Sequence, residues 1–534
     1  MDQIVVSPIY GWAAGIALIV FAGVGLLGYW LGGTRIEGFM VMDRKAPWIM
    51  IAGTYIATWI SAGTFIGAFA LGYGQGFGRV LWNYGSLWGI SFFVFFIGIP
   101  LRRARLITVP DFFHYFWNRP EMKVWATLLL VVAQTVYMIG QATAMGKLFS
   151  VVFPITFQAG ATIFMLVVAA YVTIGGMWAV VLSDTLMFIV FSVATIIGFP
   201  FALSYMGGFE ALTTKLVQVH PGSWNWSGTP DMGPAYAFGQ FFIWFALASA
   251  SPYLVNRAFV ARSEKDIAKG LAFGQLIAMI FLFLLFTCSA GVYLFVPGLK
   301  DTDFAGIWFI TTPIPTPVGV LLIAGVVAAA VSTVNTLCIT VGEAIGRDIY
   351  QRFFNRNASE RSVVLVTQGG IIASVLVALV GGIQRFDITI FILQWAAAIF
   401  LATYLPAFIM SLYWKGSTGK GIFWGMLAGG ILYPTLTTVE RSVGGEAGFV
   451  RTYGLHSVIY ATAVAFLVMY VVSKLTKNSP EEEKRSKAYR EICFPTGRLF
   501  AIAGKTSAGD WLWINVILAV NVLFMAWFIY SITR

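Results

Sequence analysis

The feature that most constrains this chain is a succession of long apolar runs, most of them 20 or more residues in length. That is the length an α-helix needs to cross the hydrocarbon core of a bilayer. The alternating segments typical of membrane β-barrels are absent. Only 11% of the residues are charged, whereas an ordinary soluble domain has about 25%. The sequence therefore predicts an all-α membrane protein with many spans.

The apolar runs predict about 14 spans, since each has roughly the length of one crossing. The first run follows no Lys or Arg and is too long for a signal-peptide core, so we expect it to be retained. The expected spans are 10–31, 47–74, 79–100, 123–150, 157–178, 184–206, 235–258, 270–296, 317–345, 361–384, 388–413, 419–439, 454–475 and 511–533.

The basic residues are unevenly divided between alternate loops. With the N-terminus outside, 26 of the 34 Lys and Arg residues, Arg257 included, fall in inner loops and eight fall outside. Positive charge concentrates on the inner side of membrane proteins. We therefore expect a plasma (inner) membrane protein with both termini external. The net charge of +11 follows from this topology and does not indicate a nucleic-acid partner.

The ninth expected span carries a cluster of polar side chains. Ala329, Ser332, Thr333 and Thr336 share one helical face, and Asn335 lies beside them. Each of these polar groups needs a partner in hydrocarbon. Two explanations remain open: hydrogen bonds to backbone or a neighbouring helix, or a bound cation coordinated by these oxygens.

Two spans contain helix-breaking residues at similar depths, Gly63 in the second and Pro252 in the seventh. Such a pair is typical of discontinuous helices around a midplane binding site, although Gly and Pro are frequent in membrane helices anyway. The carbonyls of Ala57 and Ile60 precede the first break by about one turn. They are free to face a cation that the hydroxyls of the polar cluster also reach.

Asp184 lies at the edge of the sixth span. A carboxylate within a membrane helix costs on the order of 2.5–3.5 kcal/mol, so a partner is expected. It is either a helix N-terminal charge favoured by the macrodipole or a group beside a cation.

Several functional classes lack their motifs. The chain has no Walker A sequence, no HExxH and no paired cysteines. We therefore expect neither an ATP-driven pump nor an enzyme, and no zinc site.

Five motifs in order resemble the sodium:solute symporter family: WISAGTFIG, IGGMWAVVLSD, NRAFVARSEKDIAKG, VSTVNTLCITVGEAIGRDIY and SLYWKGSTGKGIFWGMLAGG. They extend over about residues 45–430. The resemblance implies a leucine-transporter-like fold with two inverted five-helix repeats, 47–206 and 235–413. Residues 1–46 and 414–534 would be peripheral, as in the 14-span sodium/sugar symporters.

The resemblance also implies binding sites. The common sodium site corresponds to the carbonyls of Ala57, Ile60 and Ala329 and the hydroxyls of Ser332 and Thr333. Some members bind a second sodium ion, at positions that are here Asp184, Ser332, Asn335 and Thr336, where asparagine departs from the usual serine. The solute cavity corresponds to Thr64, Asn83, Ser86 and Gln394.

The predicted function is sodium-coupled import of a small polar organic solute by alternating access, with no obligatory protein partner. The eighth span has no lysine, unlike sugar-binding members, which slightly favours organic acids or amino acids. Alternatives are proton coupling through Asp184 or Glu343, and a non-transporting nutrient sensor. The identity of the solute and the number of sodium ions remain open.

Overall fold

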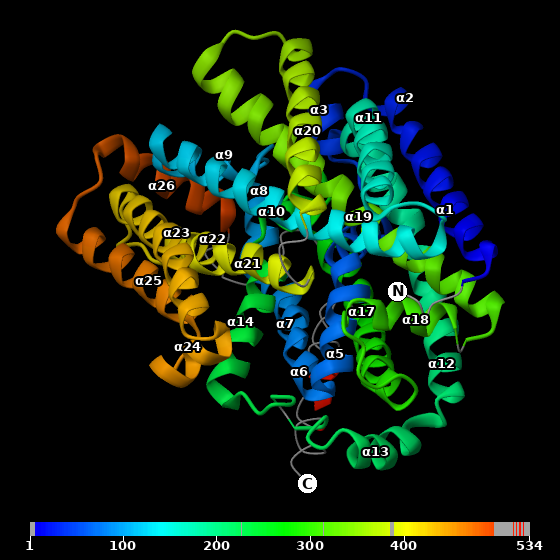
Figure 1. Ribbon diagram of the computed structural model, residues 1–534. Helices are drawn as coiled ribbons and strands as arrows, with labels where there is room; N and C mark the ends of the chain where they lie inside the picture. The colour runs from blue at the N-terminus through cyan, green and yellow to red at the C-terminus, as the bar shows by residue number, and fades with distance from the viewer. Residues whose placement is uncertain are drawn as a thin grey trace.

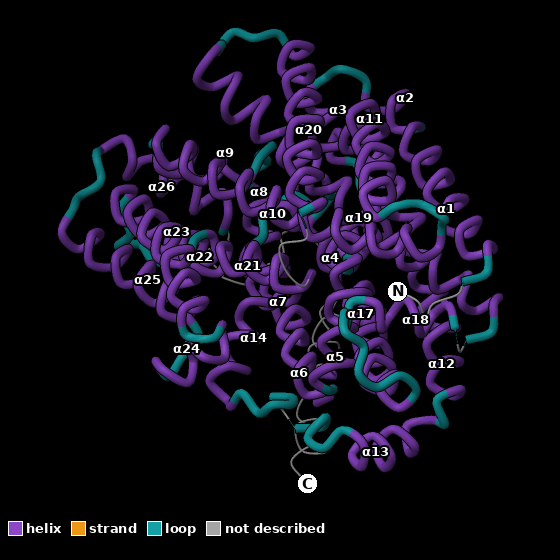
Figure 2. The backbone as a smooth tube through the Cα atoms, viewed as in Figure 1, coloured by secondary structure: helices purple, strands orange, loops and turns teal. Residues whose placement is uncertain are grey.

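Apolar runs of this length form helices because a backbone in hydrocarbon must satisfy its own hydrogen bonds. The computed structural model describes residues 6–225, 227–312, 314–384 and 389–495, with scattered positions between 516 and 527. In this part of the chain the regular structure is helical (Figures 1 and 2), apart from an isolated bridge between Ala46 and Ala261. The expected span 511–533 lies almost wholly outside the described residues.

Among the described residues, 11 helical stretches are long and apolar enough to cross a membrane, or 12 if one bent pair is a single span. The prediction of a helical protein with many spans is confirmed, while this count is below 14. The stretches are α1 (Pro8–Leu26) with α2 (Gly28–Gly32), α6 (Phe77–Leu81) with α7 (Gly85–Phe92) and α8 (Ile99–Arg103), α10 (Pro120–Val152), α11 (Phe157–Val193) with α12 (Phe199–Tyr205), α14 (Gly233–Ala250) with α15 (Pro252–Val255), α17 (Glu264–Gly291), α19 (Thr316–Glu343), α20 (Glu360–Ile383), α21 (Thr389–Ala402) with α22 (Tyr404–Tyr413), α23 (Gly419–Ser442) and α25 (Ser457–Leu475).

The bent pair and the shorter helices complete the fold. The bent pair is α4 (Trp48–Trp59) with a π-helix (Gly63–Ala68) and α5 (Phe69–Gln75). The others are α3 (Ile36–Val41), α9 (Val109–Trp117), α13 (Gly208–Val219), α16 (Arg257–Val260), α18 (Phe304–Thr311), α24 (Gly445–Tyr453) and α26 (Pro480–Cys493), with π segments Phe93–Gly98, Ala194–Gly198 and Ala344–Phe354 and 3-10 turns Met42–Arg44, Trp82–Tyr84 and Val292–Leu294.

Both predicted helix breaks are confirmed. α4 and the helix that begins at Gly63 are bent by 50°, and Ile60 between them has extended dihedral angles (φ −82°, ψ 116°). In the second break Ser251 is extended (φ −65°, ψ 125°). Pro252 lacks the N–H that would continue the helix. The short helices α15 and α16 then lead away from the break.

One 49-residue stretch, Phe157–Tyr205, stands where the sequence predicts two spans. It is interrupted at Gly176, whose φ of 58° and ψ of −147° are not helical. A Cβ here would lie 2.6 Å from the carbonyl oxygen of Phe39, so the position requires glycine.

The two halves of this stretch run in opposite directions. Just after the interruption, Ala179 contacts Gly28 of α2. Later, Gly198 contacts Leu322 in the first turns of α19, and α19 begins beside Tyr10 at the start of α1. The chain therefore reaches the α2 end of the bundle and returns to the end where α1 begins.

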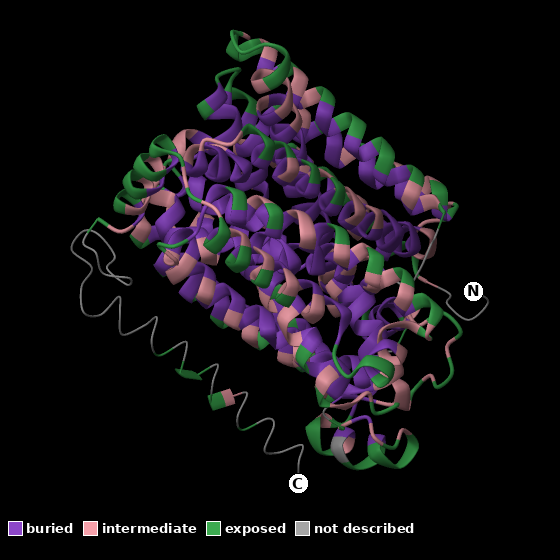
Figure 3. Cartoon of the chain, turned by 90° about the vertical axis from the view of Figure 1, so that its left-hand side faces the viewer, coloured by how far each residue is buried: buried purple, intermediate pink, exposed green. Residues whose placement is uncertain are grey.

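α19 lies at the centre of the bundle and positions the polar cluster. Every residue from 325 to 343 is buried, and α19 packs against α4, α10, α11 and α20. Peripheral helices instead expose apolar side chains, as a lipid-facing surface does: Trp12 and Ile19 of α1 are each 71% exposed. Figure 3 shows this division between a buried interior and exposed outer faces.

The two ends of the bundle carry different short helices (Figure 1). α3, α9 and α26 lie toward one end and α13 and α24 toward the other. Following the predicted topology, we call these the inner and the outer end.

Candidate functional site

The broken end of α4 meets the polar face of α19. The Ser332 hydroxyl donates to the carbonyl oxygen of Ala57 at 2.7 Å. The Thr333 hydroxyl donates to the carbonyl of Ala329 at 3.0 Å and lies 3.4 Å from that of Ile60. The structure thus brings together all five residues of the predicted sodium site, and each is buried.

Helix geometry explains why these oxygens gather here. The last carbonyls of a helix have no partner within it and form the negative end of its dipole. The Thr58 carbonyl also lies 2.9 Å from the Thr333 hydroxyl, an oxygen that the sequence prediction did not include. In membrane proteins with discontinuous helices, unwound backbone carbonyls coordinate sodium ions, and hydroxyl oxygens can accept the same ion. Their arrangement is chemically suited to that ion.

A second polar group surrounds Asp184, which is fully buried. Its carboxylate accepts hydrogen bonds from the Thr54 hydroxyl at 2.6 Å and the Asn335 amide at 2.9 Å. Thr336 joins this group through the Thr58 hydroxyl, 2.9 Å away, and through the carbonyl oxygen of the Asn335 side chain at 3.2 Å. The expected members of the second site are therefore neighbours, but Asn335 turns a donor toward the carboxylate.

Arg257 was predicted to be an inner-loop charge, and this is wrong: the side chain is 0% exposed. Its Nη2 lies 3.7 Å from Asp184 and 3.5 Å from the Thr58 hydroxyl, and it also bonds the Thr336 hydroxyl. The break at Pro252 redirects the chain, so that α16 lies against the site. The available sequence signal was the buried carboxylate, which required a partner.

The other acidic candidate, Glu343, is 1% exposed at the inner end of α19. It accepts a hydrogen bond from the Asn256 amide at 3.0 Å. Asn256 directly precedes Arg257, so the same redirected segment reaches both carboxylates.

Among the described residues, no hydrogen bond joins two of the four predicted solute residues. The Thr64 hydroxyl accepts from the Ser61 N–H at 3.3 Å within the α4 break. The Asn83 amide donates to the carbonyl oxygen of Val80 in the preceding helix α6, 2.9 Å away. Gln394 donates to Gln240 of α14. The fourth, Ser86, has no hydrogen-bond partner among the described residues. α14 packs against the segments that carry Asn83, Ser86 and Gln394.

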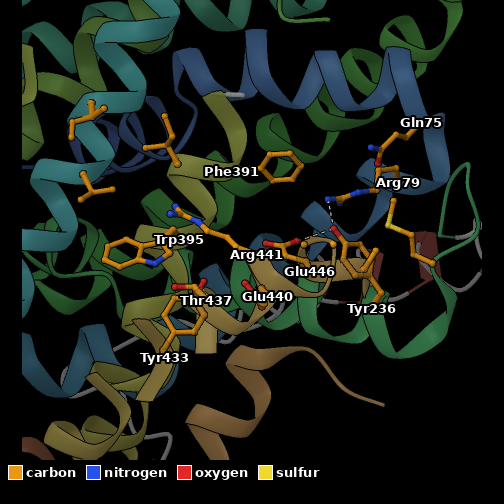
Figure 4. Close-up of a pocket in the computed structure, with 17 residues that line it drawn as sticks. Gln75, Arg79, Tyr236, Phe391, Trp395, Tyr433, Thr437, Glu440, Arg441 and Glu446 are labelled. Atoms are coloured by element: carbon orange, nitrogen blue, oxygen red, sulfur yellow. Dashed lines mark hydrogen bonds between the residues drawn. The ribbon is translucent and has the colours of Figure 1, made fainter. Parts of the chain in front are cut away.

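A cavity of about 640 Å³ lies nearer the outer end (Figure 4). None of the four predicted solute residues lines this cavity. Its walls include nearby positions on α5, α6, α14 and α21, and residues of α24. Its lining is Gln75, Arg79, Val136, Ile139, Met232, Tyr236, Phe391, Ile392, Trp395, Tyr433, Thr437, Glu440, Arg441, Gly444, Gly445, Glu446 and Ala447. The sequence prediction treated Arg79 only as one of the eight outer basic residues.

The inner end carries a buried ion cluster. Lys123 of α10 contacts Asp111 of α9 at 2.7 Å and Asp348, after α19, at 2.8 Å. Arg347 also contacts Asp111, at 3.2 Å. Burial opposes the charge of Asp111, but Lys123 and Arg347 outweigh it and hold the pKa of this carboxyl well below its usual range. The cluster ties together three segments at the end opposite the cavity.

Comparisons with known proteins agree with this architecture. The sodium/pantothenate symporter of Escherichia coli (strain K12) is 24% identical over 457 residues, covering 84% of this chain and 92% of that protein. A Na+-coupled sialic acid symporter, solved in a substrate-bound outward-open state, superposes with a TM-score of 0.72 at 15% identity, covering 88% of this chain and 99% of its own. A nucleobase-cation-symport-1 family transporter in a closed conformation superposes with a TM-score of 0.53 at 14% identity. The superposition covers 84% of this chain and 98% of that transporter.

The family model for the sodium:solute symporter family matches residues 39–429, well over half of the chain. The match contains both helix breaks, the polar cluster of α19 and the two carboxylates beside Arg257. The structural likenesses support the same transporter fold. This chain belongs to the sodium:solute symporter family, and it is a sodium-coupled symporter that imports a small solute, not an enzyme.

Proposed function

We propose that sodium binds between the broken end of α4 and α19, on the carbonyls of Ala57, Ile60 and Ala329 and the hydroxyls of Ser332 and Thr333. Its binding would be coupled to solute import by alternating access. The observation that carries this proposal is the 2.7 Å separation of the Ser332 hydroxyl and the Ala57 carbonyl. A cation between two such helices holds them together.

The test is solute uptake into proteoliposomes at constant pH, with sodium replaced by choline. Ser332→Ala combined with Thr333→Ala should raise the sodium concentration for half-maximal uptake at least about tenfold, the equivalent of 1.4 kcal/mol. Ser289→Ala is a matched control, because this buried hydroxyl donates within its own helix, to Phe286 at 2.8 Å. Unchanged sodium dependence in the double variant contradicts the proposed site, whereas uptake that follows a pH gradient supports proton coupling instead.

The same proposal assigns one sodium ion to each transport cycle. Arg257 already places a positive charge beside Asp184, and the Asn335 amide donates to that carboxylate. A second cation among Asp184, Asn335 and Thr336 would be repelled by the Arg257 guanidinium and would face the N–H side of the Asn335 amide. Asp184 then serves as the counter-ion of Arg257.

The finer topology is also part of the proposal. The reversal at Gly176 divides Phe157–Tyr205 into two crossings, which supports 14 spans if 511–533 forms another. Residues 47–206 and 235–413 would be the inverted repeats, each with a broken first helix. We place both termini outside the plasma (inner) membrane, on the distribution of basic residues.

The solute is proposed to be a small organic acid or amino acid that passes Thr64, Asn83, Ser86 and Gln394. The curated relative transports pantothenate, according to its name, at 24% identity. Neutral groups that donate and accept hydrogen bonds suit hydroxyl, amide and carboxylate functions. This supports a polar metabolite and leaves its identity to a binding screen.

A further inference from the structure

Arg79 of α6 is a buried cation with most of its hydrogen-bonding groups unused. It is 1% exposed. Its Nη2 donates to the Tyr236 hydroxyl at 2.6 Å, but Nε and Nη1 have no hydrogen-bond partner within the described part of the chain. A buried guanidinium left in this state is costly, because its lost hydration is not replaced.

The neighbouring residues fix the orientation of this guanidinium. Its carbon lies 4.9 Å from the centre of the Tyr236 ring. The Tyr236 hydroxyl in turn donates to Glu446 at 2.9 Å, and Gln240 donates to the same carboxylate at 2.9 Å. One edge of Arg79 is therefore held in place, while the remaining N–H groups stay free.

The free groups belong to the wall of the outer cavity, and Figure 4 shows the Arg79 side chain pointing toward the other residues that line it. A volume of about 640 Å³ is in the range of small-molecule sites. Apolar side chains of α10 and α21 line another part of it: Val136, Ile139, Phe391 and Ile392. The cavity therefore combines an apolar wall with two arginines, the buried Arg79 and the exposed Arg441, and this combination suits an amphiphilic anion.

A buried acid in the same wall limits the charge of such an anion. Glu440 is 6% exposed, and its Oε1 has no hydrogen-bond partner among the described residues. It can accept a hydrogen bond from a hydroxyl or amide group of the ligand, but it disfavours a second negative charge.

We propose that Arg79 recognises the carboxylate of the transported solute and selects monocarboxylates with an apolar portion. The guanidinium binds a carboxylate with directed, charge-assisted hydrogen bonds, which a neutral amide does not match. This inference rests on the proposed function, since it assumes that the solute enters through the outer cavity.

The test compares acids with their amides on purified full-length protein in sodium buffer, by thermal stabilisation. The probes are pantothenate, lactate and benzoate, each with its amide, and glucose as a neutral solute. At least one acid should stabilise the protein at a concentration at least tenfold lower than its amide does. Arg79→Gln should weaken binding of that acid at least tenfold and equalise acid and amide.

Two variants separate recognition from folding. Arg79→Lys keeps the charge without the planar fork, so it should bind the acid more weakly than wild type but still prefer it to the amide. Arg451→Gln, at an exposed arginine of α24 outside the cavity lining, should behave as wild type. The inference is overturned if no acid binds, if an amide or glucose binds equally well, or if Arg79→Gln keeps the preference.

Repeating the measurement in choline distinguishes the two proposals. Arg79-dependent acid binding that needs no sodium would contradict the proposed link between solute binding and the sodium site of α4 and α19, and would leave this inference standing. Sodium-dependent uptake of a neutral solute that Arg79→Gln does not alter would contradict carboxylate recognition by Arg79 and leave the proposed function standing.

Discussion

The Ser332 hydroxyl lies 2.7 Å from the Ala57 carbonyl although 275 residues separate them in the chain. The contact joins the broken end of α4 to the centre of α19, so it forms only when the two helices are packed together. An ion bound here would favour that packing over arrangements in which the helices separate. Ion binding and conformation are thereby linked through one interface.

The first prediction concerns the hydroxyl at position 333. Thr333→Ala should raise the sodium concentration for half-maximal uptake by about three- to tenfold, because one hydrogen-bonding oxygen is worth roughly 0.5–1.5 kcal/mol. Thr333→Ser retains the oxygen and should stay close to wild type. Equal defects in both variants would mean that the methyl group, and not the oxygen, matters.

The second prediction concerns topology. Reporter tags inserted in 259–269 and in 476–510 should report the cytoplasmic side, and a tag at Arg534 the external side, because basic residues concentrate in inner loops. Tag accessibility in intact cells is the measurement. A cytoplasmic tag at Arg534 would show that one span is missing from the proposed 14.

The third prediction concerns stoichiometry. Reversal potentials in proteoliposomes, measured with the solute identified by the binding screen, should give a sodium-to-solute ratio near one. The reason is that Arg257 supplies the positive charge beside Asp184. A ratio near two would contradict this, and Asp184→Asn should then bring it toward one.

The fourth prediction concerns the buried pair itself. Arg257→Gln should lower the free energy of unfolding by about 3–5 kcal/mol, because it leaves the Asp184 carboxylate buried without its cation. Adding Asp184→Asn should recover part of the loss, and a double-mutant cycle on thermal stability measures the coupling. Additive losses would mean that the two side chains do not act as a pair.

The fifth prediction concerns Gln394. Gln394→Ala should weaken solute affinity about tenfold or more, since two lost hydrogen bonds at roughly 0.5–1.5 kcal/mol each reach that size. Sodium binding without solute should hardly change, because Gln394 bonds Gln240 and is not among the ion ligands. Wild-type solute affinity would show that the residue only supports α14.

Local sequence rules predicted the parts of the site that depend on one helix at a time. Helical spacing placed Ser332 and Thr333 on one face, and Gly63 and Pro252 marked the breaks. The surroundings of Arg257 and Arg79 could not be predicted in this way. Each arginine lies near the end of an apolar run, so the count of loop charges treated it as an ordinary loop residue. Its burial depends on helices that are distant in the chain.

The turn at Gly176 also bears on how the protein is made. Because the direction of the chain changes there without a polar loop, the segments on either side offer no hydrophilic stretch that could rest in water between them. They would enter the bilayer from the ribosome together, as a helical hairpin. A bulky residue at Gly176 would then act during biogenesis and reduce the amount of protein that reaches the membrane.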